Sequence, residues 1–250
     1  MAGTAVRGRL NWLLAEAVEL VAETPRVRTI VFDVPAWEGH RPGQHVDIRL
    51  TAEDGYQAQR SYSIAAPEDG VRVVITVELV DDGEVSPYLI EELRVGDSIE
   101  LRGPIGGYFV WEPGDGESVQ LIGGGSGVAP LMAMVRARVA ARSSEPMRLL
   151  YSARSLEDVI YREELESLNA VDGIDVAYTL TRSQPPGWEG LSRRVDRAML
   201  EAVACPPTAG PACYVCGPTG FVETAAAALV EQGHPAARIR TERFGPTGGP

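Results

Sequence analysis

The sequence has few cysteines and lacks any long apolar run. No stretch reaches the roughly 18 to 20 apolar residues that a membrane-spanning helix needs, and residues 1–9 carry no apolar segment of signal-peptide length. The three cysteines are too few for a disulfide framework, which makes a reducing compartment the default. We therefore expect a cytoplasmic protein with no membrane partner.

The cysteine spacing does not predict a metal site. Cys213 and Cys216 form a C-x-x-C pair, a spacing found in some metal and redox sites. A zinc site usually needs two further Cys or His ligands, and His40, His45 and His234 are scattered along the chain. No C-x4-C-x2-C run of the kind that ligates a plant-type 2Fe–2S cluster occurs. The sequence favours two separate thiols at the end of a buried strand.

Basic side chains are also in deficit. The 250 residues include 23 Lys and Arg against 35 Asp and Glu, a formal net charge of −12. A surface this acidic opposes general nucleic-acid binding. Hydrophobic residues make up 44% of the chain, which is enough for a packed core, and the length fits one large domain or two of ordinary size.

Short strand-like segments separated by Pro and Gly turns fill the first half of the chain. Apolar and β-branched residues mark these segments, of which residues 71–80 (VRVVITVELV) are the strongest example. Many short strands with regular turn signals are typical of an antiparallel barrel or sandwich. The sequence predicts strands at 28–34, 46–50, 71–80 and 97–102, and one short helix at 86–93.

After residue 118 strands alternate with helices, which implies a doubly wound parallel sheet covered on both faces. We place the joint at residues 112–118. The predicted domains are an N-terminal antiparallel β-barrel, residues 1–113, and a C-terminal α/β domain, residues 114–250, whose last residues, 245–250, we expect to be mobile. The predicted strands are 119–122, 147–151, 174–179, 214–216 and 238–243, and the predicted helices are 129–141, 161–168 and 219–232.

A glycine-rich turn joins the first strand and the first helix of the α/β domain. Residues 120–130 read QLIGGGSGVAP, a G-x-G-x-x-P pattern rather than G-x-G-x-x-G. Backbone N–H groups in such a loop can approach a pyrophosphate without a Cβ clash, and the helix N-terminus favours negative charge. A tight strand-to-helix turn is the alternative interpretation. The strand before the loop and the helix after it favour phosphate binding.

The end of the next strand bears on cofactor choice. An NAD site usually places Asp or Glu on the ribose about 20 residues after the glycines. Ser152 and Arg154 stand there instead, and Glu145 precedes the strand, so it should lie at the wrong edge of the sheet. Arginine suits the 2′-phosphate of NADP because guanidinium pairs with phosphate in a planar, charge-assisted way. Arg182 and Arg194 follow nearby, although solvated surface charges would give the same pattern.

Three motifs in order resemble the ferredoxin–NADP reductase family. They are Arg60-Ser61-Tyr62-Ser63, the glycine loop 123–130, and Cys216-Gly217-Pro218. The resemblance covers about residues 10–244. It implies an FAD-binding barrel followed by a domain that binds NADPH or NADH, in agreement with the pattern of strands and helices.

The resemblance implies roles for residues of the barrel. Arg60 should pair with the FAD pyrophosphate, Tyr62 should pack on the isoalloxazine, and Ser63 should hydrogen-bond near flavin N5. A bidentate cation suits a diphosphate, and an aromatic face suits a flat ring system. Further cofactor contacts, several through the backbone of a second phosphate loop, are implied for Ser61, Val77, Glu78, Gly83, Val85 and Ser86.

The resemblance also implies roles in the α/β domain. The Cys216 thiol should lie close to the nicotinamide, and Glu242 and Phe244 should lie near the flavin, where Phe244 covers the ring until nicotinamide displaces it. With Ser63, these three residues form the predicted catalytic set. The predicted cofactor-binding set in this domain is Gly125, Ser126, Gly127, Ser152, Arg154, Arg182, Arg194, Gly217, Pro218 and Thr219.

The function implied by the resemblance is hydride transfer from NAD(P)H to bound FAD, followed by transfer of single electrons to a separate ferredoxin or other acceptor protein. The carrier is expected to be separate because this sequence lacks 2Fe–2S ligands. The arginines favour NADPH over NADH. Arg136, Arg138 and Arg142 are candidates for a basic patch that receives an acidic ferredoxin. Two alternatives stay open: a flavin or quinone reductase that uses small acceptors, and a non-catalytic electron-relay subunit of a larger complex.

Overall fold

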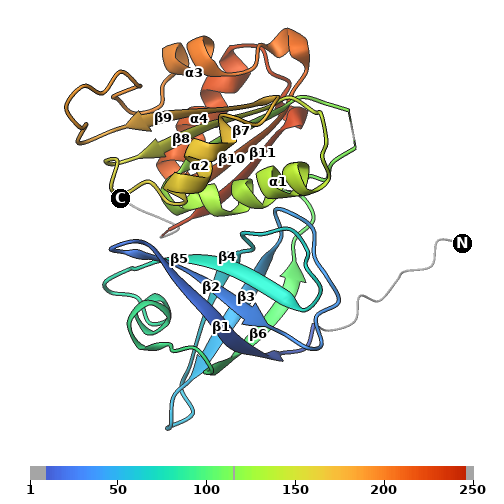
Figure 1. The fold of residues 1–250 in the computed structure, drawn as a ribbon, viewed down its shortest axis with the longest axis vertical. Coiled ribbons are helices and arrows are strands. Elements are labelled where there is room, and N and C mark those ends of the chain that lie inside the picture. Colours follow the sequence, from blue (N-terminus) through green and yellow to red (C-terminus); the bar gives the residue numbers. More distant parts are fainter. Residues whose placement is uncertain (1–9, 115, 246–250) are drawn as a thin grey trace, which may run out of the picture.

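The computed structural model describes residues 10–114 and 116–245 (Figure 1). Expectations about residues 1–9 and 246–250 lie outside the described residues, as does residue 115 of the predicted joint. The first half of the chain forms an antiparallel β domain and the second half a parallel α/β domain, one stacked on the other in Figure 1. This is the two-domain fold class that the sequence predicts.

The first domain is a six-stranded antiparallel sheet with the order β4-β3-β6-β1-β2-β5. Directly after β4, Ile64 forms a bridge to Ile75 of β5, which brings the two outer strands together and closes the barrel. Alternate residues point inward and fill the core. The strands are β1 (Leu13–Thr24), β2 (Val27–Asp33), β3 (His45–Thr51), β4 (Gln57–Ser63), β5 (Arg72–Glu78) and β6 (Ser98–Ile105), and a π-helical turn, η1 (Tyr88–Glu92), lies within the predicted helix.

Strand β1 is absent from the predicted strands. Its sequence, LLAEAVELVAET, is rich in Ala, Leu and Glu, which favour helices. Pairing with β2 on one side and β6 on the other supplies its backbone hydrogen bonds. Ala15 and Ala17 alternate into the core and are fully buried. Strand pairing and burial therefore override local propensity here.

The second domain is a five-stranded parallel sheet with the order β11-β10-β7-β8-β9. One buried cluster contains residues of α1 and α2, and a separate cluster contains residues of α3 and α4, so helices cover both faces as predicted. No helix within residues 10–114 or 116–245 is long and apolar enough to cross a bilayer. The elements are β7 (Val119–Gly124), η2 (Gly125–Gly127), α1 (Val128–Ala140), β8 (Met147–Ala153), α2 (Arg162–Leu168), β9 (Ile174–Leu180), α3 (Arg197–Val203), η3 (Pro207–Ala209), β10 (Ala212–Pro218), α4 (Thr219–Glu231), η4 (Ala236–Arg238) and β11 (Ile239–Phe244).

The C-x-x-C pair lies on β10, and its two thiols face opposite sides of the sheet. Cys213 packs in the cluster that contains α4, whereas Cys216 packs in the cluster that contains α1. Both are buried and free. No group of three or more His, Cys, Asp or Glu able to hold a metal occurs among the described residues. The prediction of two separate buried thiols is confirmed.

The basic patch expected on α1 is wrong for two of its three arginines. Arg138 is 2% exposed and donates to the carbonyls of Glu145 and Asp172. Arg136 pairs with Glu164 at 2.5 Å. Both guanidinium groups satisfy backbone or carboxylate acceptors inside the protein. They are therefore structural, and α1 does not present a basic face to a partner.

Candidate active site

The end of the glycine loop and the ends of β10 and β11 lie against the barrel. Ser126 in the loop donates to Oε2 of Glu78 at the end of β5, at 2.8 Å. Ser63 at the end of β4 donates to Oε2 of Glu242 in β11, at 3.4 Å. These two hydrogen bonds join the domains. They bring together predicted site residues that lie 48 and 179 positions apart along the chain.

Glu242 is the centre of this meeting point. The Cys216 thiol lies 4.0 Å from its Oε2, and Nδ1 of His45 lies 3.9 Å from its Oε1. Burial raises the pKa of Glu242 to about 7, although the hydrogen bond from Ser63 acts in the opposite direction. Burial also lowers the pKa of His45, against the pull of Asp47. A carboxyl group of this pKa can hold or release a proton at neutral pH.

His45 is a site residue that sequence reasoning missed. It is the cross-strand partner of Ser63 in the β3–β4 register, so the two side chains share one face of the sheet. The sequence showed only a histidine in a Pro-Gly-Gln-His turn. The strand register, which the sequence does not specify by itself, is what brings His45 to Glu242.

Glu242→Gln is expected to stabilise the folded protein at high pH. The folded pKa of about 7, against an ordinary 4.5, means that the fold binds a proton that the unfolded chain has released. The resulting penalty is absent below pH 4.5 and complete above pH 7, where ~1.4 kcal/mol per pH unit gives about 3 kcal/mol. Urea unfolding at pH 5 and pH 8 measures it. The exposed Glu38→Gln is the control, and a gain for Glu242→Gln that does not grow with pH would contradict the prediction.

Arg60 and Tyr62 lie on β4 with side chains on the same face, as strand alternation requires. The Arg60 guanidinium is exposed and pairs with Glu84 at 3.1 Å, and Glu84 also accepts from the Tyr56 hydroxyl. Tyr62 is half-buried against the barrel core, and burial raises its pKa. Because an exposed ion pair contributes little stability, a diphosphate can displace Glu84 from Arg60.

Ser61 points away from Arg60 and Tyr62. Its hydroxyl donates to Oδ1 of Asp47 at 2.6 Å, and Arg102 pairs with the other carboxylate oxygen at 2.5 Å. The position of Ser61 on the opposite face of β4 directs it toward Asp47. The structure therefore gives Ser61 a role in holding β4 to β3.

Two groups of the predicted second phosphate loop already make hydrogen bonds to Val80. The N–H of Gly83 donates to the carbonyl of Val80 at 2.9 Å, and the Ser86 hydroxyl accepts the N–H of Val80 at 3.1 Å. The side chains of Val77 and Val85 are fully buried in the barrel core. Val77 and Val85 can therefore contact a ligand only through their backbone, and Gly83 serves to close a turn.

The glycine loop packs directly on the end of β10. A Cβ at Gly127 would lie 2.4 Å from the carbonyl oxygen of Cys216 and 2.7 Å from the nitrogen of Gly217. Gly125 has φ of 55°, in the left-handed region that favours glycine. The first turn of α1 follows at once and contains Pro130, as predicted. Only residues without a Cβ allow this close approach of loop and strand.

Residues 216–219 lie at the carboxyl end of β10, where open α/β sheets bind ligands. Cys216 is buried, and burial raises the pKa of its thiol, so the sulfur stays protonated. Gly217 is buried, whereas Pro218 and Thr219 are exposed at the start of α4. Phe244 pairs with Pro218 in the β10–β11 register and is half-buried against the α1-side core. The predicted nicotinamide residues are therefore neighbours.

Arg154 and Arg182 follow the carboxyl ends of β8 and β9, and Arg194 lies in the loop before α3. The backbone N–H of Arg182 donates to the carbonyl of Arg154 at 2.8 Å, and Thr179 donates to the carbonyl next to Arg194. The side chains of Arg154, Arg182 and Arg194 are exposed. Most other arginines donate side-chain hydrogen bonds or form ion pairs. Within the described residues, the side chains of these three make no such bond. Ser152 pairs with Gly124 of the glycine loop.

Glu145 lies at the opposite edge of the sheet, as predicted. Its Oε1 accepts the N–H groups of Gly114 and Gly116 at 2.7 and 3.2 Å. It therefore holds the joint between the domains. A cavity of about 670 Å³ lies elsewhere, between β1 and the start of α2, and none of the predicted site residues lines it.

Comparison with known proteins gives two domain matches. Residues 16–110 match the oxidoreductase FAD-binding domain, and residues 121–227 match the oxidoreductase NAD-binding domain. Ferredoxin–NADP reductase B of Sorangium cellulosum is 32% identical over 81% of this chain and 84% of its own length. The chain belongs to the ferredoxin–NADP reductase family.

Some of the relatives are longer than this chain. The glycine betaine monooxygenase reductase subunit of Chromohalobacter salexigens is 32% identical over 98% of this chain but only 66% of its own length, so the chain spans about two thirds of that protein. NADH-cytochrome b5 reductase 1 of Aspergillus terreus is 28% identical over 78% of this chain and 68% of its own length. Among solved structures, the FAD/NAD-binding domain of nitric oxide dioxygenase from Vibrio cholerae has a TM-score of 0.83 at 27% identity, covering 94% of this chain and 99% of that one.

The residues of this family member fit the two cofactors. An exposed guanidinium and a half-buried phenol lie along one strand, as a diphosphate and a flat ring would require. In the α/β domain, a glycine cradle that a Cβ would fill lies at the start of α1. The family resemblance inferred from three motifs is confirmed, and the chain is an oxidoreductase with FAD- and NAD(P)-binding domains.

Proposed function

We propose that the protein takes hydride from NADPH onto bound FAD and passes single electrons to a separate acceptor protein such as a ferredoxin. The observation that carries this proposal is the convergence of Ser63, Cys216 and Glu242 from two domains on one point. Such a point suits two stacked redox rings that must exclude water while they react.

Bound FAD would supply the step from two-electron to one-electron chemistry. The chain supplies position and charge. Arg60 binds the diphosphate, Tyr62 supports the flat ring, and Ser63 directs its hydroxyl at the proton-holding carboxyl group of Glu242. His45 faces the second oxygen of that carboxyl group at 3.9 Å, so proton exchange between the buried site and solvent has a titratable neighbour.

Anaerobic titration of the purified holoprotein tests the proposal. NADPH is expected to bleach the flavin absorbance stoichiometrically, and a 2Fe–2S ferredoxin is expected to reoxidise it. No bleaching with either NADPH or NADH would overturn the proposal in favour of an electron-relay subunit. Loss of FAD on gel filtration, with turnover of added free flavin, would favour a flavin reductase that uses small acceptors.

Arg154→Ala is expected to lower the preference for NADPH over NADH about tenfold or more. The reason is that charge-assisted bonds to a 2′-phosphate are worth roughly 1.5 to 3 kcal/mol, and ~1.4 kcal/mol is tenfold. The ratio of kcat/KM values for the two nucleotides measures it. Arg142→Ala removes another exposed arginine of the same domain and is expected to leave the ratio unchanged. An unaltered ratio in Arg154→Ala would mean that the 2′-phosphate lies elsewhere.

A further inference from the structure

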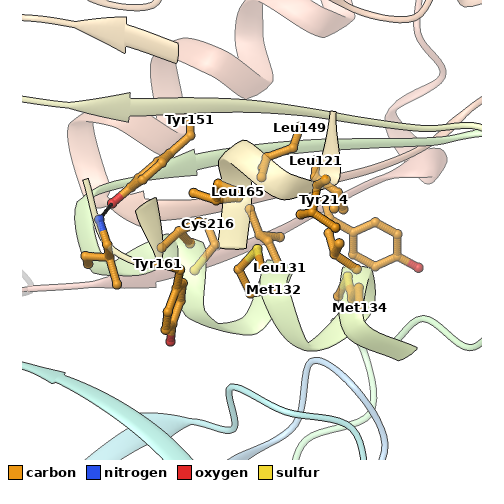
Figure 2. Close-up of a cluster of buried hydrophobic side chains, with 14 of the residues drawn as sticks. Leu121, Leu131, Met132, Met134, Leu149, Tyr151, Tyr161, Leu165, Tyr214 and Cys216 are labelled. Carbon is orange, nitrogen blue, oxygen red and sulfur yellow. Dashed lines mark hydrogen bonds between the residues drawn. The ribbon is translucent and has the colours of Figure 1, made fainter. Parts of the chain in front are cut away.

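Tyr161 joins the two domains at a point away from the residues assigned above. It stands at the start of α2, is 5% exposed, and has a backbone φ of 58°, in the left-handed region that residues with a Cβ rarely adopt. Figure 2 shows its ring at the edge of the α/β core, directed toward the barrel. A bulky residue held in this conformation requires surrounding contacts that fix it.

Four hydrogen bonds form a closed circuit that begins and ends on Tyr161. Its hydroxyl bonds to that of Thr76 in β5, which lies 2.9 Å from the hydroxyl of Thr29 in β2. Thr29 donates to one carboxylate oxygen of Glu23 in β1 at 2.7 Å, and the other oxygen accepts the backbone N–H of Tyr161 at 3.3 Å. Each hydroxyl has a single proton to donate, and that of Thr29 goes to Glu23. The direction is therefore fixed: Tyr161 donates to Thr76, and Thr76 donates to Thr29.

Arg136 of α1 encloses the same junction. Its guanidinium carbon lies 4.5 Å from the centre of the Tyr161 ring, a cation–π distance. Its Nη1 donates at 2.5 Å to the carbonyl of Ala65, two residues after β4, and its Nε and Nη2 bind Glu164. Tyr161 and Arg136 therefore hold β5 and the end of β4. These two strands carry the predicted flavin residues.

The junction also connects to the nucleotide side. Tyr161 lies at the end of residues 154–161, the segment that follows β8 and begins with Arg154. The N–H of Ile160 donates to the hydroxyl of Tyr151, a fully buried residue of β8, at 3.3 Å, and Figure 2 shows this bond. One short segment is thus anchored to the parallel sheet at one end and to the barrel at the other.

From this arrangement we infer that Tyr161 is a positioning residue: it sets the distance and angle at which the nicotinamide domain faces the flavin domain. The inference rests on the proposed function above. Hydride transfer needs its reacting atoms about 3 to 3.5 Å apart, and a misplacement of about 1 Å can cost a factor of about 100. A junction on the two flavin strands can therefore change the rate of hydride transfer without touching either cofactor.

Tyr161→Phe tests the inference because it removes the hydroxyl and leaves the ring beneath Arg136. At saturating NADPH, the rate constant for flavin reduction in anaerobic stopped flow is expected to fall about tenfold. The long-wavelength absorbance of nicotinamide stacked on flavin is expected to weaken. The Kd for NADP+ and the FAD content are expected to stay within about twofold of the wild-type values. The backbone at Arg154 is held separately, because the N–H groups of residues 182 and 183 donate to its carbonyl.

Thr76→Val removes the same hydrogen bond from the barrel side. If one of the two variants fails to fold, the other still tests the inference. The double variant is expected to be no slower than the slower single variant, since both lose one shared interaction. Tyr178→Phe is the matched control: it removes a phenol hydroxyl of the same domain for which the described residues offer no hydrogen-bond partner.

The wild-type holoprotein is measured first. If neither nucleotide reduces it, the proposed function fails, and this inference fails with it. If the wild type is reduced and Tyr161→Phe matches it in rate and absorbance, only the inference is overturned. Equal slowing of Tyr178→Phe, or additive losses in the double variant, would also overturn it.

Discussion

Arg60→Ala is expected to weaken FAD binding about 100-fold, so that the purified variant is largely colourless. Arg60 presents an exposed guanidinium next to a half-buried aromatic ring, and its partner Glu84 is a surface carboxylate that a diphosphate can replace. Bidentate contact between guanidinium and phosphate is among the strongest hydrogen-bonded pairs in water, and each ~1.4 kcal/mol is tenfold in affinity. Fluorescence quenching of added FAD by the apoprotein measures the change.

Arg72→Ala is the matched control for Arg60→Ala. Arg72 is also an exposed barrel arginine, and it lies 3.7 Å from Asp33 in a surface ion pair. Both substitutions remove one surface ion pair, so neither is expected to alter thermal stability appreciably. Normal FAD content in Arg60→Ala would show that the pyrophosphate is held by other groups. Equal FAD loss in both variants would point to a general charge effect.

Gly127→Ala is expected to slow flavin reduction by NADPH about 100-fold while FAD stays bound. The added methyl group would lie 2.4 Å from the carbonyl oxygen of Cys216 and 2.6 Å from its carbonyl carbon, so the glycine loop and the end of β10 must separate. Both carry predicted nicotinamide-binding residues, and a displacement of about 1 Å at the reacting atoms is worth about two orders of magnitude. Stopped-flow reduction of the flavin gives the rate.

Gly220→Ala makes the same chemical change near the same edge of the sheet. A Cβ there meets no atom within 4 Å, so this variant is expected to reduce its flavin at the wild-type rate. Flavin content and melting temperature measured in parallel separate a local defect from unfolding. A wild-type reduction rate in Gly127→Ala would show that the cofactor does not use the contact between loop and β10.

Much of the fold follows from local patterns. The strand runs 28–34 and 119–122 and the helix run 219–232 each coincide closely with an observed element, since apolar periodicity and turn residues act locally there. Strand β1 and helix α3 do not follow from such patterns. β1 has a helix-favouring composition that pairing with two neighbours overrides, and α3 is only seven residues long. Short or contradictory segments depend on tertiary contacts that no local window contains.

The site shows the same division. The motif around Arg60 and the glycine loop are contiguous, so the sequence reveals them. His45 reaches Glu242 only through the β3–β4 register, and Tyr161 reaches Thr76 only through the packing of two domains. Arg138 was expected on the surface as a charge, yet it is buried because two backbone carbonyls need its donors. Roles that depend on distant partners are the ones that sequence reasoning misses.

The opposite orientation of Cys213 and Cys216 has a consequence for electron flow. Three residues of extended strand separate their Cα atoms by about 10 Å, beyond the roughly 7 Å that a disulfide can bridge. A C-x-x-C pair at a helix start would form an oxidisable dithiol next to the redox centre, able to drain reducing equivalents or to shut the enzyme down. On β10 the pair is buried on both faces and cannot close. At the proposed nicotinamide site, the strand would thus keep this pair from acting as a competing electron sink, although the C-x-x-C spacing by itself suggests one.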